Sequence, residues 1–274
     1  MTTFFFARRA ALATLLAMLV PTLPALAGPA RDPHDVISAE VLPGWLGDDG
    51  VRMAALRLVL QPGWKTYWRS PGAAGVPPVF DWSGSTNISG VRVHWPRPTP
   101  FTQYGLTTLG YANELILPLE LFPRQAGTDA ALKGRVALGV CQDICLPLTL
   151  DFAADLPATR SGDGTAAIRA ALKARPTPGA APALCALEPI EDGLRITATL
   201  QAPSQGTGET VVFEPGQRDL WVSETQVSRT SHTVTASAEI VPPEGRPFAL
   251  SRQDMRITLI GGRGAVQFDG CTGD

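Results

Sequence analysis

The chain has 274 residues, a formal net charge of −2 at pH 7 and four cysteines. This charge balance excludes the strongly basic surface that binds nucleic acid or anionic lipid. A content of 27 glycines and 25 prolines, with apolar runs of strand length between turn residues, predicts an all-β sandwich architecture with room for two domains.

The amino terminus has the pattern of a secretory signal peptide. Arg8 and Arg9 precede an apolar run over residues 10–20, and small residues at Ala25 and Ala27 form a cleavage site. We therefore expect residues 1–27 to be removed. No later stretch has the length and apolarity of a membrane-spanning helix, so the sequence predicts a soluble, exported protein that does not insert into a membrane.

A first domain is expected over residues 28–156. Alternating apolar residues predict strands over residues 56–60 and 91–95. The segment 61–78 between them is rich in turn residues and carries three large aromatic side chains, Trp64, Tyr67 and Trp68. We interpret these aromatics as packing at the rim of the sandwich. The alternative is a platform on which a ligand or partner stacks.

The following segment, residues 96–105, interrupts the strand pattern. Prolines at alternate positions remove backbone donors and stiffen the chain. Phe101 and Tyr104 lie in this segment, and we expect a loop on which no strand face buries them. Strand alternation resumes over residues 110–121.

Two cysteines stand between the apolar runs 135–140 and 146–152. The three residues Gln142-Asp143-Ile144 join these runs into a short hairpin. Its period of two places Cys141 and Cys145 side by side on the face away from the core, next to small residues that leave both accessible. Exposed disulfides are the labile ones that redox proteins use. The alternative is a structural staple across the hairpin.

A composition rich in Ala, Gly, Pro and Thr predicts an interdomain linker over residues 157–183, with a short helix near 166–174. A second β-sandwich domain is expected over residues 184–274, ending in a hairpin over 257–268. Cys185 opens this domain and Cys271 closes it. We interpret this pair as a structural disulfide, which stabilises the fold by about 4–5 kcal/mol on the chain-entropy view.

Four motifs of the first domain resemble the amino-terminal periplasmic domain of the DsbD/ScsB thiol:disulfide reductases. They are Trp64-Lys-Thr-Tyr-Trp-Arg-Ser-Pro-Gly72, His94-Trp-Pro96, Gly110-Tyr111 followed by Leu117-Pro118, and Val140-Cys-Gln-Asp-Ile-Cys-Leu-Pro147. The cysteine hairpin is the most specific part. The resemblance implies an immunoglobulin-like sandwich, so the expected fold class is all-β with two immunoglobulin-like β-sandwich domains in tandem.

The resemblance also implies a periplasmic thiol:disulfide oxidoreductase that needs no cofactor. The Cys141–Cys145 pair would take electrons from a separate membrane electron-transfer protein of DsbD or CcdA type, because this chain ends at Asp274 where family members usually continue into a membrane domain. It would pass them to oxidised thioredoxin-fold proteins of the periplasm, in cytochrome biogenesis or copper tolerance. By the same resemblance Cys145 forms the mixed disulfide.

Further site residues follow from the resemblance. Phe101 would cap the cysteines, with Tyr104 on the same loop, and Gln142, Asp143 and Tyr111 would be neighbours of the pair. The three-residue spacing between the cysteines is closer to the ScsB branch than to enterobacterial members. Thr99 and Pro100 stand where those members carry acids, so a proton-handling role for the cap loop is not expected. An Asp143 carboxylate beside the pair would raise the pKa of the nearby thiol.

Two alternatives to the relay remain. The cysteines could bind Cu(I) together with His94 or Met53, since soft ligands suit that ion. The spacing lacks the second ligand pair of strong metal sites, so we assign no metal. The other alternative is a non-catalytic adaptor in which both sandwiches bind a partner and both disulfides are inert.

Overall fold

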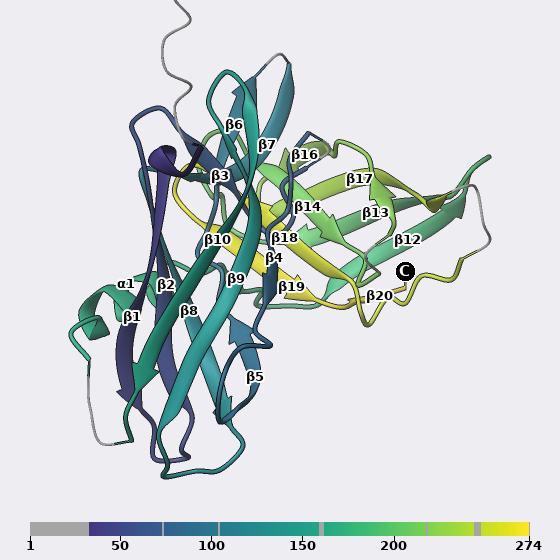
Figure 1. Cartoon of the computed structure of the whole chain (residues 1–274). Helices are drawn as coiled ribbons and strands as arrows, with labels where there is room; N and C mark the ends of the chain where they lie inside the picture. Colours follow the sequence, from purple (N-terminus) through teal and green to yellow (C-terminus); the bar gives the residue numbers. More distant parts are fainter. Residues whose placement is uncertain are drawn as a thin grey trace, which may run out of the picture. The chain divides into compact units, whose positions relative to one another are not determined.

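The structure is a computed structural model that describes residues 33–273, apart from residues 73, 104, 159–161, 218 and 244–247. The expected signal peptide lies outside the described residues, as does Tyr104. Strands dominate the described part of the chain, and no helix within it is long and apolar enough to cross a membrane. The fold class expected from the sequence, all-β with two sandwiches, is confirmed (Figure 1).

The first sandwich consists of two sheets, preceded by a 3-10 helix, η1 (Pro33–Val36). The four-stranded sheet has the order β1 (Ile37–Leu46), β2 (Arg52–Leu60), β8 (Glu114–Pro123), β5 (Ile88–Val93). The six-stranded sheet has the order β10 (Cys145–Leu156), β9 (Ala130–Cys141), β3 (Lys65–Tyr67), β7 (Leu106–Ala112), β6 (Thr99–Gln103), and β4 (Val79–Asp81) also pairs with β9. All of these pairings are antiparallel.

The core of this sandwich follows from the period of two along its strands. On β9, Val136, Leu138 and Val140 point inward, and β10 adds Leu148, Leu150 and Phe152 to the same core. The apolar faces predicted for the two cysteine-bearing strands are therefore correct, and they determine which face of the sheet carries the cysteines. Burial of this apolar stripe is the main favourable term that holds the hairpin on the sandwich.

The expected loop at residues 96–105 is wrong over residues 99–103, which form strand β6. Its register with β7 places Thr99 opposite Gly110 and Phe101 opposite Thr108. The prolines are tolerated because β6 is the edge of its sheet, where one side of a strand has no partner and a missing donor costs nothing. Phe101 thus sits on a strand, and its side chain is half-buried.

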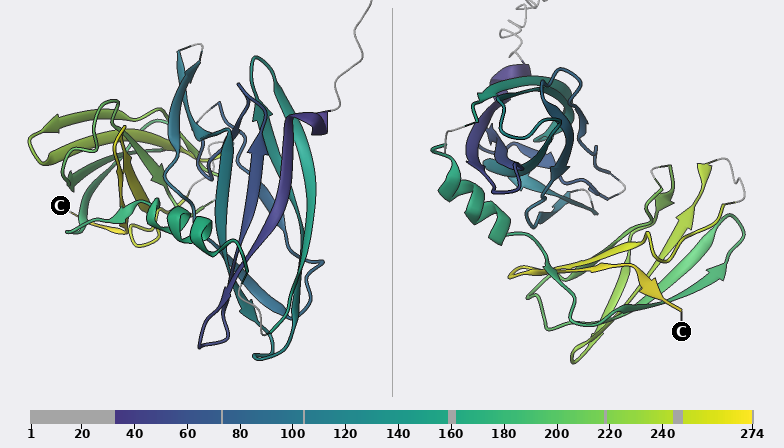
Figure 2. Two further views of the ribbon diagram at one scale, coloured as in Figure 1. Left: turned by 90° about the vertical axis from the view of Figure 1, so that its left-hand side faces the viewer. Right: turned by 90° about the horizontal axis from the view of Figure 1, so that it is seen from below.

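One α-helix is present in the described chain, α1 (Thr165–Lys173), close to the predicted position. It buries Ile168 and contacts strands β1 and β8 of the first sandwich, and the guanidinium of Arg169 lies 4.6 Å from the ring centre of Trp45 (Figure 2). We propose that residues 157–183, which include this helix, are the linker between domains at 28–156 and 184–274.

The second sandwich also has two sheets. The first has the order β11 (Thr177–Pro178), β19 (Ala265–Asp269), β18 (Arg256–Ile260), β14 (Thr210–Glu214). The other has the order β15 (Trp221–Val222), β17 (Thr233–Val241), β13 (Leu194–Gln201), β12 (Ala183–Pro189), β20 (Cys271–Thr272), with β16 (Gln226–Thr230) paired to β17. The predicted terminal hairpin corresponds to β18 and β19.

Candidate functional site

The cysteine hairpin is the centre of the candidate site. Strand β9 ends at Cys141 and β10 begins at Cys145, and the register pairs these two residues directly. They form a disulfide, with their Cα atoms 4.1 Å apart. The turn is closed by the backbone N–H of Gln142, which donates to the carbonyl oxygen of Ile144 at 3.0 Å. The pairing of the two cysteines is therefore produced by local chain geometry.

The two sulfur-bearing residues differ in exposure. Cys145 is exposed, whereas Cys141 is only 1% exposed. The expectation that both are accessible is wrong for Cys141, which is buried with the Tyr67 hydroxyl against its sulfur. A side chain at Gly139, the next residue on the same face of β9, would lie 3.0 Å from Val76 and 3.2 Å from the ring of Tyr67. The small residues beside Cys141 accommodate these covering groups instead of leaving the sulfur open.

Tyr67 contacts both sulfurs of the disulfide. Its hydroxyl oxygen lies 3.0 Å from the Cys141 Sγ and 3.5 Å from the Cys145 Sγ. A disulfide sulfur carries no proton, so the phenol O–H is the donor. Tyr67 is 4% exposed, and this burial raises the pKa of its hydroxyl. The phenol therefore stays protonated at neutral pH and remains available to donate to sulfur.

Strand β3 separates two groups of side chains. Trp64 and Trp68 pack in the core of the first sandwich, whereas the packing role expected for all three aromatics does not account for Tyr67, which contacts the Cys141 sulfur. Lys65 and Tyr67 point to the opposite face, where the cysteines lie, because β3 pairs with β9 through Lys65 opposite Cys141. The period of two along residues 64–68 is the sequence signal that distinguishes Tyr67 from the two tryptophans.

Lys65 connects the cysteine pair with Phe101. Its Cα is paired with that of Cys141, and directly opposed residues on one face have Cβ atoms roughly 4.5–5.5 Å apart. Its Nζ lies 5.2 Å from the centre of the Phe101 ring. Phe101 is thus placed against Lys65, and Lys65 stands beside Cys141.

The other expected neighbours are placed differently. Gln142 and Asp143 lie exposed in the hairpin loop next to Ile144, which is 65% exposed. Tyr111 is not brought to the cysteines: it is paired with Thr66, and so it faces the core. Its hydroxyl donates to the carbonyl oxygen of Pro96 at 2.7 Å, which holds the chain that leads into β6.

The residues considered as additional copper ligands lie on the other sheet. Met53 on β2 is paired with Glu120 on β8, and the Glu120 carboxylate is 3.0 Å from Nε2 of His94. On the other side of the ring, Arg175 donates to Nδ1 of His94 at 3.0 Å, and burial lowers the pKa of this histidine. Within the described residues no group of three or more His, Cys, Asp or Glu side chains has a geometry that could hold a metal.

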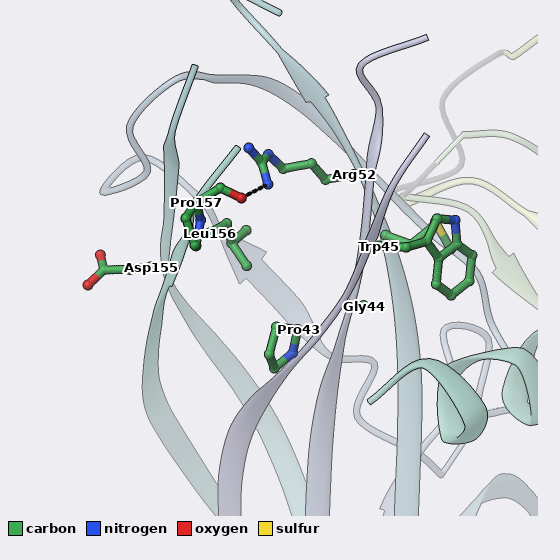
Figure 3. Close-up of a pocket in the computed structure, with 8 residues that line it drawn as sticks. Pro43, Gly44, Trp45, Arg52, Asp155, Leu156 and Pro157 are labelled. Carbon is green, nitrogen blue, oxygen red and sulfur yellow. Dashed lines mark hydrogen bonds between the residues drawn. The ribbon is translucent and has the colours of Figure 1, made fainter. Parts of the chain in front are cut away.

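A cavity of about 50 Å³ lies at the other end of the first sandwich, where β10 finishes (Figure 3). The buried guanidinium of Arg52 lines it and donates to the carbonyl oxygens of Pro157 at 2.9 Å and Thr128 at 3.2 Å. These two bonds tie the end of β10 to the loop between β8 and β9. Arg52 therefore has a structural role, far along β10 from Cys145.

The second disulfide is enclosed. Cys185 on β12 is fully buried and Cys271 on β20 is 9% exposed, and their Cα atoms are 5.8 Å apart. Both cysteines belong to the apolar core of the second sandwich. Neither sulfur-bearing residue of this pair is exposed as Cys145 is.

Two comparisons with known proteins found similar ones. Residues 39–157 match the family described as thiol:disulfide interchange protein DsbD, N-terminal. Among solved structures, the chain is similar to the N-terminal periplasmic domain of ScsB from Proteus mirabilis, with a TM-score of 0.64 and 21% sequence identity over 87% of this chain and 92% of that one. At this identity the structural likeness establishes the fold. No curated protein sequence matches the chain.

Proposed function

We propose that this protein relays reducing equivalents through Cys141–Cys145, on the premise that residues 39–157 match the family of thiol:disulfide interchange proteins described as DsbD, N-terminal. The donor is a membrane electron-transfer protein of DsbD or CcdA type. The acceptors are oxidised thioredoxin-fold proteins, and the exchange takes place in the periplasm. The processes it serves are cytochrome biogenesis or copper tolerance.

The observation that carries this proposal is the unequal environment of the two sulfurs. Cys145 is open to attack, while Cys141 is covered and receives a hydrogen bond from Tyr67. In thiol–disulfide exchange the attacked sulfur must be reachable, and the leaving sulfur departs faster when its thiolate is stabilised. The site therefore supports attack at Cys145 with Cys141 as the leaving group.

The reductive half of the relay then proceeds in two steps. A donor thiolate attacks Cys145 Sγ, a donor–Cys145 disulfide forms, the Cys141–Cys145 bond breaks, and its electron pair leaves with Cys141 as a thiolate. The Tyr67 O–H, 3.0 Å from this sulfur, donates to the developing charge. The donor's second thiolate attacks the mixed disulfide, so the donor is oxidised to a disulfide and Cys145 is released as a thiolate.

The oxidative half reverses these roles. The Cys145 thiolate attacks the disulfide of an oxidised thioredoxin-fold protein and forms a mixed disulfide with it. The Cys141 thiolate then attacks Cys145 Sγ, which restores the Cys141–Cys145 bond and leaves the acceptor as a dithiol. The exposed side chain of Ile144, in the loop between the cysteines, offers an apolar contact at the position where the partner must dock.

The experiment that tests the relay is a redox titration of the full mature protein in glutathione or dithiothreitol buffers, followed by alkylation and mass mapping of each cysteine pair. We expect Cys141–Cys145 to titrate well above the roughly −300 mV that marks structural disulfides, and Cys185–Cys271 to stay oxidised there. Equal potentials below that value for both pairs would overturn the relay and leave a non-catalytic adaptor.

A further inference from the structure

One face of the six-stranded sheet carries a row of groups that meet at Lys65. Register places Lys65 opposite Cys141, and Cys141 opposite Cys145. Tyr67, two residues further along β3, shares this face and contacts the Cys141 sulfur. In the other direction the Lys65 ammonium group lies over the ring of Phe101 on edge strand β6. Lys65 therefore stands between the redox pair and the proposed cap residue.

The charges on this face change when the disulfide is reduced. In the oxidised protein the pair is uncharged and the buried Tyr67 phenol is neutral, while the electron-rich face of the Phe101 ring is in contact with the ammonium group. Reduction with loss of a proton puts a full negative charge on a sulfur opposite Lys65. An anion attracts an ammonium ion more strongly than the quadrupole of a ring does, so the two partners compete for one cation.

We propose that Lys65 is a positioning residue that holds Phe101 while the cysteines form a disulfide and turns to the Cys141 thiolate once the pair is reduced. This inference deepens the proposed function and rests on it for the identity of the leaving thiolate. As a consequence, the Lys65 ammonium group on β3 holds the proposed cap residue, Phe101, in place. The cap strand itself carries Thr99 and Pro100 immediately before Phe101, so it supplies no acid for this purpose.

Other titratable groups near Cys141 do not replace this role. Among the described elements packed around it, β3 contributes Lys65 and Tyr67, the hairpin loop contributes Asp143, and β10 contributes the Cys145 thiol, whose own ionisation would oppose a second negative charge on Cys141. Tyr67 donates a hydrogen bond without changing charge, and an Asp143 carboxylate would disfavour a thiolate. Lys65 is thus the cation that the fold aligns with this sulfur.

The test is an NMR titration of the Cys141 13Cβ signal in the full mature protein after chemical reduction, with Lys65→Met, Lys65→Arg and Phe101→Leu variants. Lys65→Met is expected to raise the titration midpoint of Cys141 by about one pH unit, because an opposite charge at close range is lost. Lys65→Arg keeps the midpoint near that of the parent. Lys133→Met, which removes a lysine from the far part of β9, is the matched control and leaves it unchanged.

Competition for the ammonium group gives a sharper readout. Phe101→Leu is expected to lower the Cys141 midpoint, since the ring no longer holds Lys65, and to have no effect in a Lys65→Met background. In the parent protein, reduction shifts the Phe101 ring signals, and in Lys65→Met it does not. An unchanged midpoint in Lys65→Met, or a Phe101→Leu shift that persists without Lys65, overturns the inference.

These outcomes are independent of electron relay. A strong chemical reductant opens the pair whatever its potential, so the titration reports on Lys65 even if the redox titration above fails. If the Cys141 midpoint responds to the Lys65 variants as expected but the pair has the reduction potential of a structural disulfide, the proposed relay is wrong and the coupling to Lys65 stands. If instead the reduction potential is that of a redox-active pair but the Cys141 midpoint does not respond to the Lys65 variants, the coupling is wrong and the relay stands. The spectra of the oxidised variants show whether each is folded.

Discussion

The two disulfides of this chain are chemically identical bonds in opposite settings. Cys141–Cys145 spans four positions at the tip of a hairpin, with one exposed sulfur and a tyrosine hydroxyl on the other. Cys185–Cys271 spans 86 positions and lies inside a core. Loop length determines how much a crosslink restricts the unfolded chain, whereas access determines whether it can exchange. These settings fit the proposal that the long buried bond stabilises the fold and the short one with an exposed cysteine takes part in exchange.

Removing one cysteine at a time is expected to give the largest effect. Cys145→Ser abolishes exchange with an oxidised thioredoxin-fold protein, because the exposed nucleophile is lost. Cys141→Ser leaves that nucleophile without its resolving partner, so a mixed disulfide accumulates on a non-reducing gel. Cys185→Ala/Cys271→Ala, the control in the other sandwich, retains exchange. Accumulation of the mixed disulfide in Cys145→Ser would reverse the assigned roles of the two sulfurs.

Loss of the Cys185–Cys271 disulfide is expected to lower stability more than loss of the Cys141–Cys145 disulfide, which is the reverse of their expected effects on exchange. Cys185→Ala/Cys271→Ala lowers the free energy of unfolding by about 4–5 kcal/mol, because an 86-position crosslink is lost. Cys141→Ala/Cys145→Ala lowers it by about 2 kcal/mol, since its loop is short. Urea unfolding followed by tryptophan fluorescence measures both. Equal losses from the two pairs would contradict the division of roles.

The cover over Cys141 can be removed from the β9 side. Gly139→Val forces Val76 and the Tyr67 ring away, since even a Cβ there lies within 3.2 Å of both. We expect a loss of about 1–3 kcal/mol of stability from overpacking and faster alkylation of reduced Cys141. Ala137→Val, two residues away on the same face at an exposed position, is the matched control. If alkylation of Cys141 is unchanged in Gly139→Val, another group covers the sulfur.

The hydrogen bond to sulfur makes a smaller contribution. Tyr67→Phe keeps the ring and removes the O–H, so the Cys141 thiolate leaves less readily. We expect reduction of Cys141–Cys145 by dithiothreitol to slow about tenfold, which corresponds to one hydrogen bond of about 1.4 kcal/mol to a charged group. Tyr111→Phe loses its bond to Pro96 on the core face of the same sheet. It should cost stability without slowing reduction, and equal slowing in both variants would argue against a specific role for Tyr67.

The smallest expected effect is a pH dependence of stability that comes from His94, beside the sheet that lacks the cysteines. Burial lowers the pKa of His94, with Arg175 and Arg92 acting in the same direction and Glu120 opposing them. The unfolded chain, with an ordinary histidine pKa near 6.5, therefore binds more protons than the folded one as pH falls through that value. Stability should decline between pH 7.5 and 5.5 by urea unfolding, and His94→Gln should reduce the decline. A decline of the same size in His94→Gln would exclude this histidine as its source.

Sequence reasoning succeeded best where contacts are local. The pairing of Cys141 with Cys145 follows from two apolar runs and a three-residue turn, so no distant part of the chain had to be known. The inward faces of β9 and β10 followed from the period of two in the same way. The placement of Phe101 failed because alternate prolines normally exclude a strand, and only the edge position of β6 removes that conflict.

Tyr67 shows what local reasoning misses. It stands between two tryptophans that pack in the core. Its aromatic side chain and its sequence neighbours are typical of a residue that packs in a core. Its partner sulfur lies 74 positions away along the chain. The period of two separates Lys65 and Tyr67 from the two tryptophans, but only the pairing of β3 with β9 places Lys65 and Tyr67 on the face of the cysteines.

By itself, then, the amino-acid sequence determined the all-β class, the cysteine hairpin and the apolar faces, because strand periodicity and short turns act over neighbouring residues. The tertiary structure decided that Cys141 is covered, that Tyr67 donates to its sulfur, and that Lys65 lies between Cys141 and Phe101. Those contacts depend on the pairing of β3 with β9 within one sheet, between segments far apart in the sequence. Such long-range register is set by burial of the whole apolar face and not by any single segment.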